Sequence, residues 1–264
     1  MPTLRVCALA FILSACVSAF PTSPADRVIE PSSSEPPDEA VLADDVRVRR
    51  LAPGVWLHVT LAGEDWGRTP ANGLLIEDGV SSLLVETGWN VRQAELLLSW
   101  ARDTLHRPVR AGVVTHFHVD RIGGVPALVA QGVPVSMREE TARLAAERGR
   151  LSTPVQHLAD AQEWESLSLF FPGAGHARDN LVVWHRNSGL LFGGCFVKDA
   201  GARDLGNVED ADLSAWPASL ERVRQRYPDV RTVVPGHGLP GGAELLAHTQ
   251  ALLREVAAPL PPAP

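Results

Sequence analysis

Six side chains that can bind a metal ion stand in four short segments, each with glycines nearby. They are His116, His118, Asp120, His176, Cys195 and His237. The first three occupy alternate positions at the end of an apolar run, so in a strand they would face one cavity. Phe117 and Val119 would then point the other way and pack. The pattern predicts a metal centre built from imidazole, thiolate and carboxylate groups.

Each of these segments follows a stretch that has the pattern of a strand. A single histidine in that setting is more often structural than functional, but four such segments together favour a shared site. Strands are predicted over residues 46–52, 55–60, 73–77, 81–86, 111–114, 167–171, 181–184, 190–192 and 230–234, and helices over 92–105, 138–149, 214–227 and 243–257. Early hairpins followed by alternating strands and helices predict a layered α/β domain with mixed sheets.

The beginning of the chain predicts an export signal over residues 1–19. Arg5 precedes an apolar run that is too short to span a bilayer. The run ends in Leu-Ser-Ala-Cys16, which resembles the bacterial lipobox and predicts cleavage before Cys16 and its lipidation. Cleavage after Ala19 is the alternative. Residues 20–45 are rich in Pro, Ser and acidic residues, which predicts a flexible tether. The folded domain is then expected over 46–258, followed by a disordered tail over 259–264.

Cysteine content and charge narrow the function further. Cys195 is the only cysteine expected in the folded domain, so no internal disulfide can form there, and metal binding would occupy its thiolate. The net charge is −7, and no basic stripe of the kind that binds nucleic acid is visible. We expect a monomer that lies outside the cytoplasm and does not bind nucleic acid.

The segments that carry the candidate ligands resemble those of the metallo-β-lactamases. The matching stretches are Thr115–Gly124, Gly175–Asn180, Gly193–Cys195, Leu205–Asn207, Asp210–Pro217 and Gly236–Gly238. The resemblance runs from about Val46 to the last predicted helix. It implies a four-layer αβ/βα sandwich with mixed sheets and with the metals at the edge between its two sheets.

The resemblance also implies two Zn²⁺ ions and the residues that bind them. The first zinc would be held by His116, His118 and His176, and the second by Asp120, Cys195 and His237. Zinc lowers the pKa of a bound water to about 7, so a zinc-bound hydroxide could attack the carbonyl carbon of a strained lactam. Asp120 would both bind the second zinc and orient the hydroxide.

The same resemblance suggests which residues contact the substrate. Lys198 matches the position that binds the substrate carboxylate, and Arg203 could assist it. Asn207 matches the position that polarises the lactam carbonyl, although it also fits a turn residue after Gly206. Trp66 lies in the loop over residues 61–70, which either flaps over the substrate or folds back on the core.

These observations predict a β-lactamase that acts on penicillins, cephalosporins and carbapenems in the periplasm, with a possible lipid anchor in the outer membrane. The alternative is a hydrolase of a thioester, lactone or phosphodiester on the same scaffold. Relatives of that kind carry a histidine directly after the aspartate, where this chain has Arg121, and here Cys195 would supply the missing ligand. A zinc-binding lipoprotein without activity would need an occluded site, whereas the glycine-lined loops indicate an open one.

Overall fold

The computed structural model describes residues 36–164 and 166–257. Its larger sheet contains strands that follow one another in chain order: β1 (Glu39–Ala43), β2 (Val46–Ala52), β3 (Val55–Leu61), β4 (Pro70–Asp78), β5 (Ser81–Val85), β6 (Val109–Val113), β7 (Val135–Arg138) and β8 (Gln156–Leu158). The strands β1 to β5 are antiparallel, and β5 to β8 are parallel. Turns at Gly54 and Gly79 join β2 to β3 and β4 to β5, and both glycines adopt positive φ.

The smaller sheet has the order β13-β12-β11-β10-β9. Its strands are β9 (Ala161–Trp164), β10 (Leu167–Phe170), β11 (Val182–His185), β12 (Leu190–Gly194) and β13 (Thr232–Pro235). The strands are antiparallel except β12 and β13, which are parallel and separated in the chain by a helix. The sheets are therefore mixed, as the sequence predicts.

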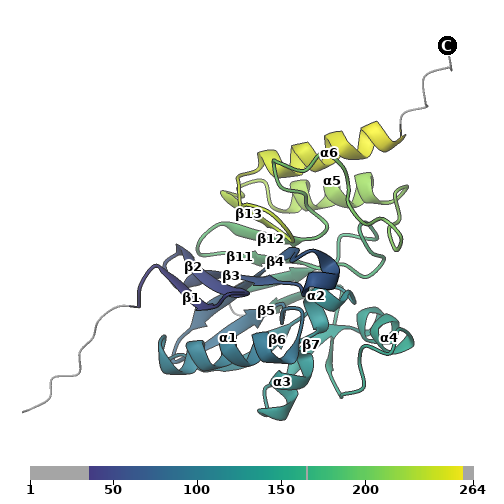
Figure 1. Ribbon diagram of the computed structural model, residues 1–264. Coiled ribbons are helices and arrows are strands. Elements are labelled where there is room, and N and C mark those ends of the chain that lie inside the picture. Colours follow the sequence, from purple (N-terminus) through teal and green to yellow (C-terminus); the bar gives the residue numbers. More distant parts are fainter. Residues whose placement is uncertain (1–35, 165, 258–264) are drawn as a thin grey trace, which may run out of the picture. The chain divides into compact units, whose positions relative to one another are not determined.

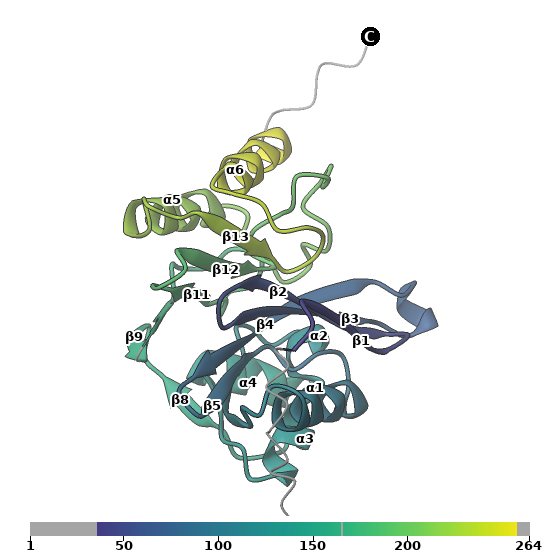
Figure 2. The same ribbon diagram turned by 90° about the vertical axis from the view of Figure 1, so that its left-hand side faces the viewer.

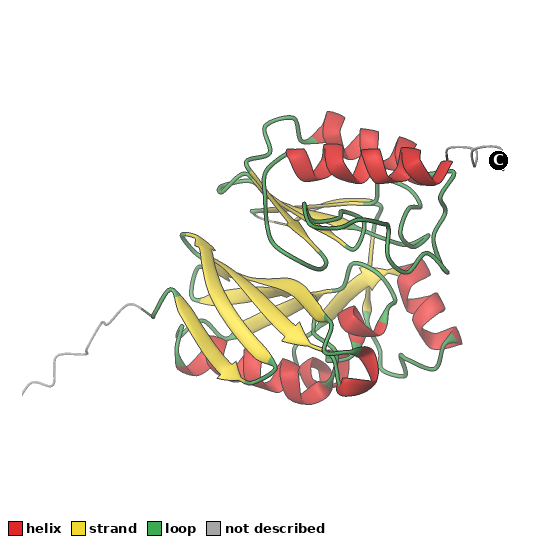
Figure 3. Cartoon of the chain, turned by 45° about the horizontal axis from the view of Figure 1, so that its top comes forward, coloured by secondary structure: helices red, strands yellow, loops and turns green. Residues whose placement is uncertain are grey.

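Helices cover the outer face of each sheet (Figures 1, 2 and 3). The described helices of the whole fold are α1 (Val91–Asp103), α2 (Val119–Ile122), α3 (Val125–Ala130), α4 (Glu139–Glu147), α5 (Trp216–Arg226) and α6 (Glu244–Ala257), with a short 3-10 helix at Glu64–Trp66. α1 and α3 cover the larger sheet, and α5 and α6 cover the smaller one. This arrangement is the predicted four-layer αβ/βα sandwich. None of the helices in the described part of the chain is long and apolar enough to cross a membrane.

Alternating apolar residues hold the layers together. In β5, Leu84 packs with α1 on one face, whereas Leu83 and Val85 pack between the sheets on the other. A third apolar cluster joins the smaller sheet to α5 and α6 around Trp216 and Leu220. Strands that are buried on both faces read as continuous apolar runs rather than as an alternating pattern. Each buried side chain of this size stabilises the fold by about 1.5–3 kcal/mol.

The structure corrects the predicted start of the domain. The tether was expected to reach Asp45, but β1 lies within that segment and pairs with β2. Ala40 and Leu42 pack against the apolar cluster beneath the larger sheet. This short apolar stretch is therefore partly buried, although its acidic neighbours in the sequence suggested a solvent-exposed linker. The predicted signal segment, Cys16 and the tail over 259–264 lie outside the described residues, and the last helix ends at Ala257.

Candidate metal centre

All six predicted ligands come from loops or a short helix at the edge between the two sheets. His116 and His118 follow β6, His176 lies between β10 and β11, Cys195 follows β12, and His237 follows β13. The alternating pattern around His118 does not come from a strand, because His118 is the N-cap of α2 and Asp120 lies in its first turn. Phe117 is buried as expected, whereas Val119 lines the pocket, contrary to the prediction from strand alternation.

The three imidazoles of His116, His118 and His176 form one group. Their ring centroids are 4.8, 5.2 and 5.0 Å apart, and His176 Nε2 lies 3.1 Å from His118 Nδ1. Tetrahedral zinc with bonds of about 2.0–2.3 Å places its ligand atoms about 3.3–3.8 Å apart. The group therefore has nearly the dimensions of a zinc site, with Nε2 of His116 buried and without a hydrogen-bond partner among the described residues.

Hydrogen bonds on the far side of two of these rings, His116 and His118, orient them. Glu86 accepts a short hydrogen bond from the Thr115 hydroxyl, and that hydroxyl oxygen lies 3.0 Å from His116 Nδ1. A hydroxyl has one proton, so a hydroxyl that donates to Glu86 accepts from His116, which leaves the lone pair on Nε2. In the same way, His118 Nε2 lies 3.1 Å from Asp210, which leaves the Nδ1 lone pair free.

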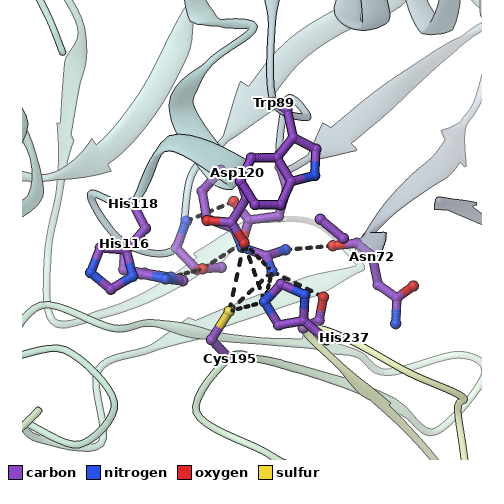
Figure 4. A network of polar contacts seen from close by, with 12 residues as sticks. Asn72, Trp89, His116, His118, Asp120, Cys195 and His237 are labelled. Carbon is purple, nitrogen blue, oxygen red and sulfur yellow. Dashed lines mark hydrogen bonds and ion pairs between the residues drawn. The ribbon is translucent and has the colours of Figure 1, made fainter. Parts of the chain in front are cut away.

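Asp120, Cys195 and His237 form the second group, which Figure 4 shows from close by. Cys195 Sγ lies 3.2 Å from His237 Nε2 and 3.9 Å from Asp120 Oδ2, and His237 Nε2 lies 3.4 Å from that oxygen. His237 Nδ1 donates to the carbonyl of Pro70, which aims Nε2 at the other two ligands. Gly236 is required for this approach, because a Cβ there would lie 2.7 Å from Cys195 Sγ.

The guanidinium of Arg121 lies directly beneath the second group and is fully buried. Its Nη2 is 2.7 Å from Asp120 Oδ2 and 3.0 Å from Cys195 Sγ, and it also donates to Gly236 O. Burial is the largest influence on Asp120 and by itself would raise its pKa, but the charge of Arg121, together with His237, His118 and a backbone hydrogen bond, holds that pKa below its usual value. Arg121 cannot bind zinc, yet it compensates the negative charge of the ligands.

The protonation of the donors fits a soft divalent cation. Burial lowers the pKa of His116 and of His176 well below the usual value, so both imidazoles are neutral and can donate a lone pair. Burial raises the pKa of Cys195 to about 12, so its thiol keeps its proton at neutral pH unless a metal ion replaces it. Buried neutral imidazoles and a thiol are the donors that zinc prefers over magnesium or calcium.

Both groups open onto one pocket of about 480 Å³. Lys198, three residues after Cys195, lines it, with Nζ 5.6 Å from the centre of the Trp216 ring. Burial lowers the pKa of Lys198, and the negative charge of Cys195, when that residue is a thiolate, partly offsets this lowering. Trp66 lines the rim with 59% of its surface exposed, and its ring contacts that of Trp89.

The other predicted contact residues behave differently from one another. Asn207 lines the pocket, and its Oδ1 accepts from the backbone of Glu209, so it is a turn residue whose amide nitrogen remains available to a ligand. Arg203 is exposed and is not brought to the pocket. The sequence analysis missed Asp210 as a partner of His118, because residues 92 positions apart give no signal of contact until the chain is folded.

Comparison with known proteins agrees with this geometry. The Metallo-beta-lactamase superfamily pattern matches residues 66–237. The metallo-beta-lactamase type 2 of Bacteroides fragilis is 38% identical over 81% of this chain and 88% of its own, and that of Bacillus cereus is 34% identical over 95% and 97%.

Solved structures show the same relationship. The metallo-beta-lactamase FIM-1 of Pseudomonas aeruginosa, solved in a mono-zinc form, superimposes with a TM-score of 0.78 at 36% identity and covers 83% of this chain and 100% of its own. A metallo-beta-lactamase from Pontibacter korlensis gives 0.75 at 40% identity, with coverage of 79% and 99%. Sequence pattern, ligand geometry and overall fold thus agree, and the chain belongs to the metallo-β-lactamases, with two groups of ligands for a dinuclear zinc site.

Proposed function

We propose that this zinc-dependent β-lactamase opens the lactam ring of penicillins, cephalosporins and carbapenems. The observation that carries the proposal is the position of two complete ligand groups in one open pocket, with the ammonium group of Lys198 beside them. A β-lactam presents a strained amide and a carboxylate a few ångströms apart, and this pocket offers a matching pair of a hydrolytic centre and a cation.

Zinc, when bound, supplies a nucleophilic water at neutral pH and polarises the carbonyl of the substrate. The chain supplies the geometry. Asp120 presents one carboxylate oxygen to Cys195 and His237. The charge of Arg121 and the neighbouring histidines favour the ionised carboxylate, so that it can accept a hydrogen bond from the attacking water. Asp120 therefore positions the water and is our first candidate for a catalytic residue.

Two side chains in the pocket fit the polar ends of the substrate. The ammonium of Lys198 makes no hydrogen bond or ion pair among the described residues, and it lines the pocket that holds the second ligand group, so it can bind the carboxylate on the fused ring. The free amide nitrogen of Asn207 can donate to the lactam carbonyl while its oxygen holds the turn. Arg203 is left out of this proposal because it does not line the pocket.

Trp66 provides the apolar contact. It lies in the loop between β3 and β4, exposed at the rim and supported by Trp89. A large exposed indole at a pocket rim can cover an apolar substituent and exclude water from the lactam. We propose that this loop closes on the substrate.

The test compares substrate classes on one preparation. Benzylpenicillin, a cephalosporin, a carbapenem and a thioester are assayed with and without a chelator, together with a metal count. We expect turnover of the three lactams, none of the thioester, and loss of activity on chelation. Preferential hydrolysis of the thioester would support the alternative class of hydrolase and contradict this proposal.

We also propose that the protein is exported to the periplasm and anchored by a lipid on Cys16, on the basis of the sequence Leu-Ser-Ala-Cys16 after an apolar run. Fractionation of cells that express the wild type and Cys16→Ala tests this. Lipidation predicts that the wild type sediments with membranes and that the variant does not. Equal membrane association of both proteins would exclude the anchor.

A further inference from the structure

Two arginines that the catalytic proposal does not use line the same pocket. Arg148 and Arg150 follow α4 and flank Gly149, which adopts a φ of 66°. Both guanidinium groups lie over the ring of Phe117, at 5.4 and 6.0 Å from its centre. Phe117 in turn contacts His118 edge to face. The arginines therefore border the three-histidine group on the side of His118.

The two arginines differ in how their charges are compensated. Arg148 forms an ion pair with Asp210 at 2.6 Å, and the same carboxylate lies within hydrogen-bond distance of His118. Arg148 therefore helps to orient a metal ligand through Asp210. Arg150 is exposed, and its guanidinium has no hydrogen bond or ion pair within residues 36–164 and 166–257. Its positive charge also reaches His118 and contributes to lowering the pKa of that imidazole.

A second cation lies on a different side of the same group. Lys198 lies over Trp216, and the Trp216 ring contacts His176 with centroids 6.0 Å apart. The pocket thus has one positive group next to His176 and another next to His118. A β-lactam also has two ends, since the ring carboxylate and the acylamino side chain project from opposite sides of the lactam.

We propose that Arg150 forms a subsite for a carboxylate on the acylamino side chain, so that the enzyme favours β-lactams with a second acidic group. The inference rests on the proposed function, with Lys198 bound to the ring carboxylate. The guanidinium offers a planar pair of N–H donors that matches a carboxylate. Glu209 also lines this pocket and opposes the attraction, and Arg150 is screened by water, so the expected preference is modest.

The experiment uses three penicillins that differ only in the side chain. Carbenicillin carries a carboxylate where benzylpenicillin carries a hydrogen, and ampicillin carries an ammonium group there. We expect Arg150→Gln to lower the kcat/KM of carbenicillin relative to benzylpenicillin by about threefold, mainly through KM, and Arg150→Glu to lower it further. The kcat/KM of ampicillin relative to that of benzylpenicillin should rise in Arg150→Glu, because the new carboxylate attracts the ammonium group of ampicillin. High salt should reduce the preference of the wild type.

Arg143→Gln is the matched control, because Arg143 lies on α4, is exposed, and pairs with Glu140 and Glu147 away from the pocket. It should leave the substrate ratios unchanged. Failure of the wild type to hydrolyse benzylpenicillin would overturn the proposed function and this inference with it. A different result would overturn the subsite alone. In that case the wild type hydrolyses benzylpenicillin normally, and the kcat/KM of carbenicillin relative to benzylpenicillin is the same in the wild type, Arg150→Gln and Arg143→Gln.

Discussion

The two ligand groups of the metal centre lie in one pocket but are built in opposite ways. The group of His116, His118 and His176 consists of neutral rings. A hydroxyl and a carboxylate behind them fix the spare nitrogens of His116 and His118, whereas Nδ1 of His176 is buried without a hydrogen-bond partner among the described residues. The group of Asp120, Cys195 and His237 lies against a buried cation, Arg121, whose guanidinium contacts all three of its ligands.

This difference predicts unequal affinity for the two metal ions. In the first group, hydrogen bonds orient two of the three rings before a metal binds, and no Lys or Arg of the described residues makes an ion pair or hydrogen bond with the ligands, so little reorganisation is needed. In the second group, Arg121 already compensates the charge of Asp120, and the thiol of Cys195 must lose a proton that its buried site retains. We expect the second ion to bind more weakly and to leave first.

Stepwise removal of metal should have the largest effect on activity, and it tests directly which of the two ions leaves first. Complete chelation should lower activity by about 10³-fold or more, since the chemistry of the site depends on zinc. With cobalt in place of zinc, the thiolate-to-cobalt charge-transfer band should disappear before the visible bands of the three-histidine group. Simultaneous loss of both signals would contradict the difference in affinity, and activity in fully metal-free protein would contradict the mechanism.

Cys195→Ser should remove metal from the second group and leave the first group loaded. The hydroxyl is a poor zinc ligand, so the variant should retain about one metal ion per chain, with activity reduced by about 100-fold or more. Metal analysis after dialysis measures this. His116→Asn is the converse variant and should weaken the first site instead. Equal loss of both ions in Cys195→Ser would mean that the groups do not bind independently.

Thr115→Val should weaken only the first group. The substitution keeps the shape but removes the hydroxyl between His116 and Glu86, which should lower the affinity of the three-histidine site by about tenfold to 100-fold. Competition with a chromophoric chelator measures each affinity. Thr115→Ser retains the hydroxyl and should behave as the wild type. If Thr115→Val instead lost the metal ion bound by Cys195, the Thr115 hydroxyl would support the second group and the prediction would be wrong.

His58 is a buried histidine that belongs to neither ligand group, so it shows what burial does to an imidazole. Burial lowers its pKa to about 4, and its Nε2 lies 3.1 Å from the carbonyl of Val85. The unfolded chain therefore binds a proton that the folded chain excludes between about pH 6.5 and pH 4. Stability should fall as the pH falls through this range, by on the order of 3 kcal/mol.

Urea unfolding of the metal-free wild type and His58→Gln at pH 7.5 and pH 4.5 measures this contribution. The other buried histidines are present in both proteins, so their effect cancels in the difference. The wild type should lose more stability than the variant on acidification. The same loss in both would show that His58 does not contribute to the pH dependence.

Much of the fold and most of the site could be predicted from the sequence. The positions of β2 and α6 agree closely with the predicted ranges, because their apolar patterns end at clear turn signals or acidic residues. β1 was missed because four apolar residues between acidic neighbours resemble a linker. β7, β8 and β9 were also missed, because each has at most two apolar residues, never adjacent, and therefore shows no apolar run, unlike the equally short β10, β11 and β13.

The sequence by itself determined which six side chains bind metal, because their types, glycine neighbours and positions after strands form a pattern that chance rarely produces. Only the tertiary structure decided how they are held. The bonds from Glu86 through Thr115 to His116, from Asp210 to His118 and from Arg121 to Cys195 join distant parts of the chain or depend on how a single side chain points. Such contacts follow from packing of the two sheets against each other, and no local pattern encodes them.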